Sequence, residues 1–215
     1  MMKRSRETRL SLALYGEVTT RKVYDMTTSK SPSAQERLMA TAYDLFTRRG
    51  IADVGVDEIV AKAGVAKATL YKYFPSKEDL VLAFLVQREE LWTDEVIDRR
   101  PAESSADPAQ QLLATFDVLD VWFRGRRDYE AWSFVKILLE VGDEGRVGEA
   151  CGAQLEKIRA IFARRAKKAG LRNVRAFSWA FNSLIKGSIV CAAEGDRDAA
   201  RRVKPMAAWL IEQHR

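Results

Sequence analysis

The chain has 215 residues, of which 47% are apolar and 31% charged, as is typical of a globular protein with one or two domains. No stretch approaches the roughly 20 apolar residues of a membrane span, and the N-terminus has no apolar signal-peptide core, so we expect a cytoplasmic protein with no membrane partner. The net charge of +6 is compatible with nucleic-acid binding but does not establish it.

Residues 1–32 carry seven basic and three acidic side chains and show little sustained periodicity. Such a segment cannot bury enough apolar surface to fold, so we predict a basic, mostly disordered tail. An alternative is a basic arm that reaches DNA phosphates or the minor groove.

A first helix is expected to begin after Ser33, because the spacing of Ser33 and Glu36 is that of a capping box. Gly50 is expected to end it. Its apolar stripe, at helical spacing, consists of Leu38, Ala42, Leu45 and Phe46.

Residues 56–80 predict two short helices joined by a tight turn, with a third helix following at once. Gly64 permits the left-handed backbone that ends the first of these helices, and Val65 is expected in the core. Leu70 and Phe74 are four residues apart and therefore point inward together. Pro75 stops the second helix. This pattern is typical of a helix-turn-helix, whose second helix enters the DNA major groove.

The run AGVAKATLYKYFPSK, residues 63–77, is dense in residues of one known pattern. It resembles the A-G-V-S-x-x-T-L-Y-x-Y/H-F-x-S/N-K run of the tetracycline-repressor-like (TetR) family of transcriptional regulators. The resemblance covers residues 33–80, since Ala42, Phe46 and Gly50 also fit the family's first helix. Gly55 and Ala66 depart from it, because the family often has hydroxyls there that cap helices and touch phosphates.

The resemblance implies an all-α fold in which an N-terminal three-helix DNA-binding domain precedes a helical ligand-binding and dimerisation domain. We place the tail at 1–32, the DNA-binding domain at 33–80 and the helical domain at 81–215. Met26 fits an ordinary start for the family, so residues 1–25 are either an extension or the result of a misassigned start.

A long helix is predicted from Ser76, which can cap it with Asp79, to about Asp98. In the family this helix connects the two domains. Residues 99–108 form a polar break with two prolines, the clearest boundary in the chain. Further helices are predicted at about 109–125, 128–141, 146–169, 172–193 and 199–213.

The second helix of the helix-turn-helix presents the candidate DNA contacts. The candidates for contact with base edges are Lys67, Ala68, Thr69 and Lys72. The candidates for contact with phosphates are Tyr71, Tyr73 and, just beyond this helix, Lys77. We expect Lys67, Lys72 and Lys77 on one edge and Asp57 and Glu58 on another. The alternative is that these are merely solvated polar side chains.

Aromatic side chains are frequent beyond residue 90, and most are expected to be core. The resemblance implies that some line a small-molecule site, for which the candidates are Trp92, Phe116, Trp122, Trp132, Phe162 and Trp179. Asn182 and Lys186 share a helix face and are candidate polar anchors for the ligand. Such sites are mostly apolar with a few placed polar groups.

In the family, the last two helices pair with their copies in a dimer; the alternative is packing within one chain. Cys151 and Cys191 are too few for a disulfide framework or a cysteine metal site and are expected to be buried thiols, with a redox sensor as the alternative. The basic residues between 157 and 175 are expected to form a solvated helix face, with a second nucleic-acid patch as the alternative.

We therefore expect a homodimeric, ligand-responsive repressor that binds a palindromic double-stranded DNA operator and is released by an apolar or aromatic small molecule. A non-specific DNA-binding protein is the alternative with the same module. An enzyme is not expected, because the single histidine, His214, lies at the C-terminus and neither a Gly-rich phosphate loop nor a metal-ligand motif is visible. We accordingly expect no catalytic residue, no metal site and no cofactor.

Overall fold

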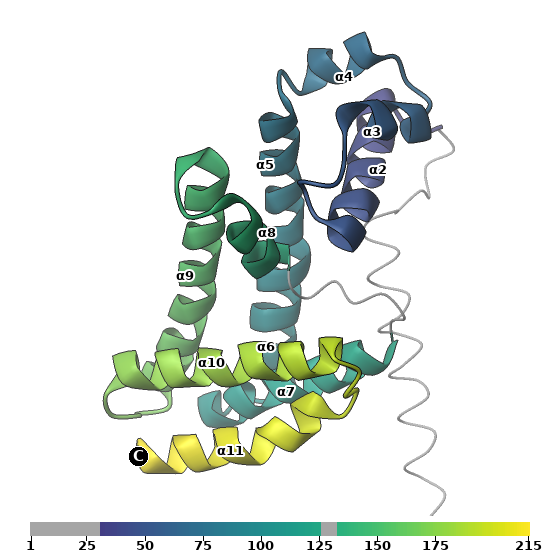
Figure 1. The fold of residues 1–215 in the computed structure, drawn as a ribbon. Helices are drawn as coiled ribbons and strands as arrows, with labels where there is room; N and C mark the ends of the chain where they lie inside the picture. Colours follow the sequence, from purple (N-terminus) through teal and green to yellow (C-terminus); the bar gives the residue numbers. More distant parts are fainter. Residues whose placement is uncertain (1–30, 126–132) are drawn as a thin grey trace, which may run out of the picture. The chain divides into compact units, whose positions relative to one another are not determined.

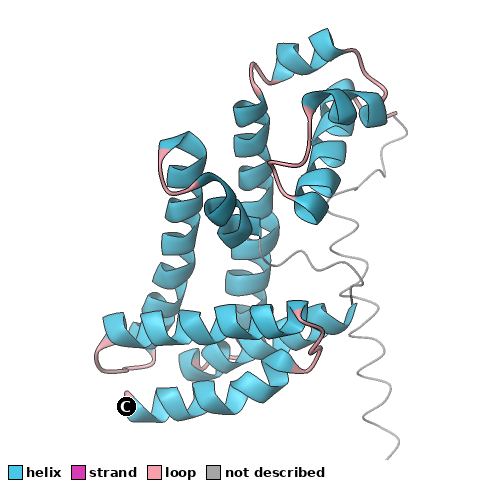
Figure 2. Cartoon of the chain, viewed as in Figure 1, coloured by secondary structure: helices cyan, strands magenta, loops and turns pink. Residues whose placement is uncertain are grey.

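The computed structural model describes residues 31–125 and 133–215, and the regular structure in these ranges is entirely helical (Figures 1 and 2). The predicted all-α fold class is confirmed. The described residues group into two units. The first comprises residues 31–88 and 133–153, and the second comprises residues 89–125 and 154–215. The predicted tail lies, up to residue 30, outside the described residues.

The first unit contains the three predicted helices of the DNA-binding domain and the helix that follows them. These are α2 (Ala34–Arg49), α3 (Val56–Ala63), α4 (Lys67–Tyr73) and α5 (Lys77–Arg88), joined by α8 (Ser133–Val141) and the start of α9 (Gly145–Lys168). The capping box of α2 is confirmed: the Glu36 N–H donates to Ser33 Oγ at 3.2 Å, and the Ser33 N–H donates to Glu36 Oε2 at 2.6 Å.

The core of this unit is built where α2 packs on α5. The ring of Phe84 meets those of Tyr43 and Phe46 edge-on, with centroids 5.3 and 5.6 Å apart. Buried Arg88 donates from Nη1 to the Tyr43 hydroxyl at 2.7 Å. Aromatic pairs of this geometry add to the burial of apolar area, so α2 is fixed on α5.

Two side chains from the later part of the chain bind this unit. Glu140 of α8 accepts a hydrogen bond from the Ile51 N–H at 2.8 Å, at the loop that follows α2. Arg146 of α9 pairs with Glu78 at 3.1 Å and Asp79 at 3.0 Å, in the first turn of α5. The DNA-binding helices are thus held by residues far away in the sequence.

The second unit begins with a π-helix, η1 (Glu89–Arg99), and continues with α6 (Arg100–Ser104) and α7 (Pro108–Gly125). The rest of α9, then α10 (Val174–Ala193) and α11 (Ala199–Gln213), complete it. The predicted polar break over 99–108 is therefore wrong for most of its length. Residues 100–104 are helical, with Pro101 as the second residue of α6, and α6 follows η1 directly. The predicted helix at 128–141 is described only from residue 133 onward.

Phenylalanines form the centre of the second unit. The ring of Phe181 lies 5.5 Å from Phe116, 4.9 Å from Phe162 and 5.4 Å from Phe177, measured between centroids. All four side chains are 0% exposed. They join α7, α9 and α10 in one core.

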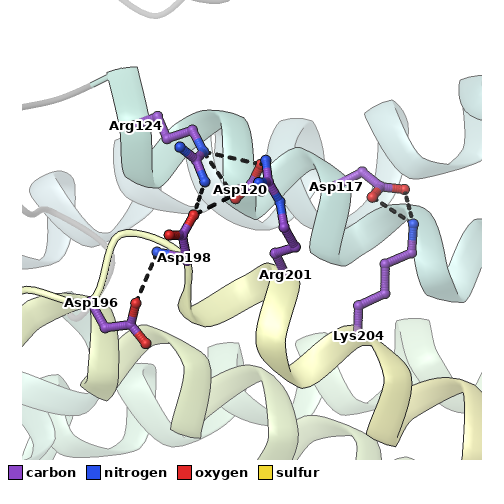
Figure 3. A network of polar contacts seen from close by, with 7 residues as sticks. All are labelled: Asp117, Asp120, Arg124, Asp196, Asp198, Arg201 and Lys204. Atoms are coloured by element: carbon purple, nitrogen blue, oxygen red, sulfur yellow. Dashed lines mark hydrogen bonds and ion pairs between the residues drawn. The ribbon is translucent and has the colours of Figure 1, made fainter.

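A charged network joins α7 to α11 on the surface of this unit (Figure 3). Asp120 accepts from Arg124 at 3.2 Å, one turn along α7, and from Arg201 of α11 at 3.0 Å. Lys204 of α11 reaches Asp117 of α7 at 2.6 Å. In these cross-helix pairs α7 supplies the carboxylates and α11 the cations, so the pairs favour one register of α11 on α7.

Two expectations about single residues in this part of the chain are wrong. Cys151 is buried as predicted, but Cys191 is exposed on α10. Within the basic region 157–175, Arg165 is buried and not solvated. Its guanidinium donates to the Ile97 carbonyl at 2.9 Å and to the Asp98 carboxylate at 3.0 Å, so it binds the last turn of η1.

Candidate nucleic-acid interface

The turn between α3 and α4 has the geometry of a helix-turn-helix (Figure 1). Gly64 ends α3 in the left-handed conformation, with φ 63° and ψ 43°. The Val65 N–H then donates to the Val60 carbonyl at 3.1 Å, and Val65 is half-buried where the sequence predicted core. Two residues later α4 begins. A left-handed residue at this point favours glycine, because a Cβ would meet the following carbonyl oxygen.

Two apolar side chains hold α4 on the unit and leave its other face to solvent. Leu70 is 0% exposed and Phe74 is 6% exposed. Tyr71 and Tyr73 are 43% and 37% exposed, which is high for tyrosine in a folded domain. Lys67, Ala68 and Lys72 are exposed as well, and Thr69 is half-buried. Six of the predicted DNA contacts therefore lie on α4, where all of them have some access to solvent.

Lys77 lies in a different environment from the other candidates. Its Nζ donates to the Ile51 carbonyl at 2.7 Å, and the side chain is half-buried. Burial lowers the pKa of this ammonium, an effect that the nearby Glu140 carboxylate opposes. The expectation that Lys77 shares an open edge with Lys67 and Lys72 is wrong in this structure. Its phosphate contact stays a prediction and would require it to leave Ile51.

The acidic residues near the turn are also not segregated as expected. Lys67 Nζ lies 2.7 Å from the carboxylate of Asp57, and Asp57 lies in the first turn of α3. The hydrogen bond that Lys67 donates to Asp57, and then the negative charge of Asp57, raise the pKa of Lys67. Glu58 pairs instead with Arg49 at 2.7 Å and with Lys62 at 3.0 Å. The two signs therefore alternate across this surface.

The helix caps follow the predicted departures. Gly55 and Ala66 make no side-chain cap, so the first N–H groups of α3 and α4 are not held by hydroxyls. Ser76 does cap α5, since its Oγ accepts from the Asp79 N–H at 3.1 Å. Helix N-termini without a side-chain cap keep donors available to an anion such as phosphate.

The loop after α2 is held by contacts that the sequence did not reveal. Gly50 has φ 93°, and a Cβ there would collide with the carboxylate of Glu140. The carboxylate accepts from Ile51, while Lys77 donates to the carbonyl of the same residue. Glu140 and Ile51 are separated by 89 residues, so neither periodicity nor motif spacing would have paired them.

Comparison with known proteins also indicates a helix-turn-helix in this part of the chain. Residues 38–84 match the family described as bacterial regulatory proteins, tetR family. The chain is 24% identical over 161 residues to the HTH-type transcriptional regulator LmrA of Bacillus subtilis, covering 73% of this chain and 85% of LmrA. A TetR-family transcriptional regulator from Streptomyces coelicolor superposes with a TM-score of 0.77, at 23% identity, over 84% of this chain and 95% of that one.

The chain is a TetR-like transcriptional regulator. It is also 37% identical over 86 residues to the HTH-type transcriptional regulator EthR of Mycobacterium tuberculosis. This match covers 39% of this chain and 33% of EthR. In a TetR-like regulator the helix-turn-helix binds DNA, so α3 and α4 form the nucleic-acid interface. Which side chains touch the DNA stays a prediction.

The predicted ligand-site residues of this TetR-like regulator fall into three groups. Trp92 and Trp122 pack with centroids 4.8 Å apart. Phe116, Phe162 and Asn182 are buried in the second unit. Trp179, by contrast, is 52% exposed, with the guanidinium of Arg159 4.3 Å from its ring centroid. Trp132 lies outside the described residues. The role of these residues in ligand binding stays a prediction.

Two buried polar atoms in the second unit have no hydrogen-bond partner among the described residues. They are Thr93 Oγ1 on η1 and Gln154 Oε1 on α9. The Nε2 group of the same Gln154 donates to Glu89, one turn before Thr93 on η1. A buried unpaired oxygen is costly unless something else satisfies it, and the sequence did not single out either of these atoms.

Two searches of the described ranges bear on other kinds of site. Within residues 31–125 and 133–215, no three His, Cys, Asp or Glu side chains are grouped so as to hold a metal ion. None of the helices in these ranges has the length and apolar character needed to cross a membrane.

Proposed function

We propose that this TetR-like regulator is a homodimeric, ligand-responsive repressor that acts in the cytoplasm on a palindromic operator. Each α4 enters one major groove, and a small molecule in the helical unit releases the DNA. The α4 contacts we propose are Lys67, Ala68, Thr69, Tyr71, Lys72 and Tyr73, with Lys77 as a phosphate contact. One α4 spans only a half-site, so a palindromic site needs two copies.

The observation that carries the dimer is the apolar surface of the last two helices. Trp179 of α10 is 52% exposed, and Met206 and Trp209 of α11 are 58% and 64% exposed. Large apolar side chains gathered on neighbouring helices mark an interaction surface when a soluble chain exposes them. A second copy offers the same surface and therefore a complementary partner.

Support for a small-molecule effector comes from the second unit. This unit contains aromatic pairs and the unpaired buried oxygens of Thr93 and Gln154, the kinds of apolar and polar groups from which small-molecule sites are built. Related folds were solved with different compounds: a regulator from Saccharomonospora viridis with choline and FadR from Bacillus subtilis with stearoyl-CoA. The fold alone therefore does not set the ligand class, and the rings of this chain favour an apolar or aromatic compound.

The effector must act through differential affinity. A ligand releases DNA only if it binds the DNA-incompetent state more tightly than the competent one, and such coupling is typically about 1–3 kcal/mol. The backbone runs without a break in helical structure from Lys77 to Ser104 through α5, η1 and α6. This continuous segment is the route that we propose for the coupling.

The first experiment selects DNA fragments with the purified full-length protein. We expect a palindrome whose half-site centres lie about 10–10.5 base pairs, or a multiple of it, apart. Selection of no preferred sequence would support the alternative of a non-specific DNA-binding protein.

A compound library is then titrated with tryptophan emission and operator displacement as parallel readouts. Compounds that alter emission should also lower operator affinity, by about 5–150-fold at saturation. Replacing half-buried Trp122 by Leu should weaken both effects together and leave operator binding without compound unchanged. Compounds that bind without altering DNA affinity would refute the ligand response while leaving DNA binding intact.

A further inference from the structure

An ion pair crosses the turn of the helix-turn-helix on its exposed side. Lys67 is the first residue of α4 and Asp57 is the second residue of α3, and Nζ lies 2.7 Å from Oδ1. The lysine side chain is 52% exposed and the aspartate side chain is 80% exposed. The carboxylate therefore lies beside the N-terminal end of the helix that reads DNA.

A carboxylate at this place repels the DNA phosphates, so it weakens DNA binding unless it also forms a favourable contact with the DNA. DNA phosphates attract cations and repel an exposed acid, and non-specific affinity rises with each phosphate that a cation neutralises. Lys67 in its pair with Asp57 cannot act as a free cation of this kind. Glu58, the next residue, does not share the task, since Arg49 and Lys62 pair with it.

The pair also has the hydrogen-bonding pattern of one kind of base pair. In the major groove a G·C pair presents guanine N7 and O6 as acceptors, followed by the cytosine N4 amine as a donor. A lysine ammonium donates to the first two groups, and an adjacent aspartate accepts from the third. An A·T pair places its donor between two acceptors, so the ammonium would face the amine of adenine.

We propose that Asp57 is a specificity-determining residue: together with Lys67 it selects a G·C base pair in each half-site, and it withholds Lys67 from non-specific phosphates. This inference rests on the proposed role of α4 as the helix in the major groove. It goes beyond that role by assigning a base preference to a residue of the preceding helix.

The test compares Asp57→Asn with Asp44→Asn. Asp44 forms an exposed pair with Arg48 at 2.7 Å on α2, so its substitution changes the net charge equally at another place. Affinities for the selected operator and for a random duplex of the same length are measured over a range of salt concentrations. Circular dichroism establishes that both variants keep the helical content of the parent.

For Asp57→Asn we expect tighter binding to the random duplex and a salt slope steeper by about 0.9, since Lys67 becomes free for one phosphate. The ratio of operator to random affinity should fall by about 5–150-fold. Asp44→Asn should keep this ratio within about twofold, because any general gain in attraction acts on both duplexes alike. An unchanged ratio in Asp57→Asn, or an equal fall in Asp44→Asn, overturns the proposal.

Selection of DNA by variants identifies the base. Asp57→Asn, Lys67→Met and the double variant should all lose preference at the same G·C position, and the double variant should lose no more than the single ones. If Thr69→Ala changes the selected sequence but Asp57→Asn does not, the role of Asp57 fails and the role of α4 stands. If neither changes it, α4 does not read the bases and the proposed interface fails with this inference.

Discussion

At the scale of single residues, Gly50 occupies a position that other side chains would not fit. Its φ of 93° lies in a region that non-glycine residues rarely adopt, and the carboxylate of Glu140 fills the space where a Cβ would lie. That carboxylate in turn accepts from the N–H of Ile51. Gly50 thus permits both the turn after α2 and the approach of α8.

We expect Gly50→Ala to destabilise the protein by about 2–4 kcal/mol. Strained backbone contributes about 1–3 kcal/mol, and displacing Glu140 from its donor adds about 1–3 kcal/mol that relaxation partly recovers. Chemical denaturation followed by circular dichroism measures the change. The control is Gly152→Ala, within α9, where no atom lies within 4 Å of a new Cβ. It should stabilise the protein by about 0.5–1 kcal/mol. Equal effects at the two glycines would contradict this account of Gly50.

Residues on the DNA-binding face could be predicted from the sequence because their determinants are local. The inward spacing of Leu70 and Phe74 determines which side of α4 faces solvent, and it placed Lys67, Ala68 and Lys72 correctly. Lys77 could not be placed in this way, since its bond to Ile51 depends on tertiary packing. The same holds for the pair of Asp57 and Lys67, which forms only when the turn brings α3 and α4 together.

At the scale of helices, the sequence predicts ends better than interiors. Capping residues act within three or four positions, so the starts of α2 and α5 followed from Ser33 and Ser76. The π-helical form of η1 has no comparable signal. Its last carbonyls are satisfied by Arg165, which lies 68 residues further on. Such a partner emerges only from the packing of α9 against η1.

Two neighbouring arginines on α9 allow this contact with the last turn of η1 to be tested. Both contact Asp98, but the side chain of Arg165 is 2% exposed and that of Arg164 is 51% exposed. Arg165→Met leaves buried carbonyls without a donor, so we expect a loss of about 2–4 kcal/mol in the free energy of unfolding.

Arg164→Met is the matched control. It removes a solvent-exposed partner of the same carboxylate and should cost less than about 1 kcal/mol. Urea unfolding at one fixed protein concentration compares the two variants, because the proposed dimer would make stability depend on concentration. A similar loss in both variants would mean that Arg165 stabilises the protein only through its ion pair with Asp98, and that its hydrogen bond to the carbonyl in the last turn of η1 contributes nothing.

At the scale of the whole molecule, the distribution of charge matters more than its sum. The net charge is +6, yet residues 33–80 hold equal numbers of acidic and basic side chains. Much of the basic character of α9 is used internally: Lys157 binds Asp94 at 2.8 Å, and Arg164 binds Asp98 at 2.6 Å. We therefore expect DNA binding to depend on the few cations that α4 presents and on two copies of α4. If the proposed dimer forms, we expect operator affinity to depend strongly on its formation.

The dimer can be tested with two residues that are equally exposed in the single chain. Met206 of α11 and Val86 of α5 are each 58% exposed, so Met206→Glu and Val86→Glu place the same charge at similarly accessible positions. In an isologous interface each residue occurs twice, so Met206→Glu puts two carboxylates into one apolar contact. We expect the dissociation constant of the dimer to rise at least about tenfold, a change of about 1.4 kcal/mol, measured by analytical ultracentrifugation.

Operator binding by Met206→Glu should weaken in parallel at low protein concentration and recover as concentration rises. Val86→Glu should retain both dimer formation and operator binding. If Met206→Glu remains as dimeric as Val86→Glu, the exposed surface of α10 and α11 is not the dimer interface, and another surface must bring the two copies of α4 to the operator.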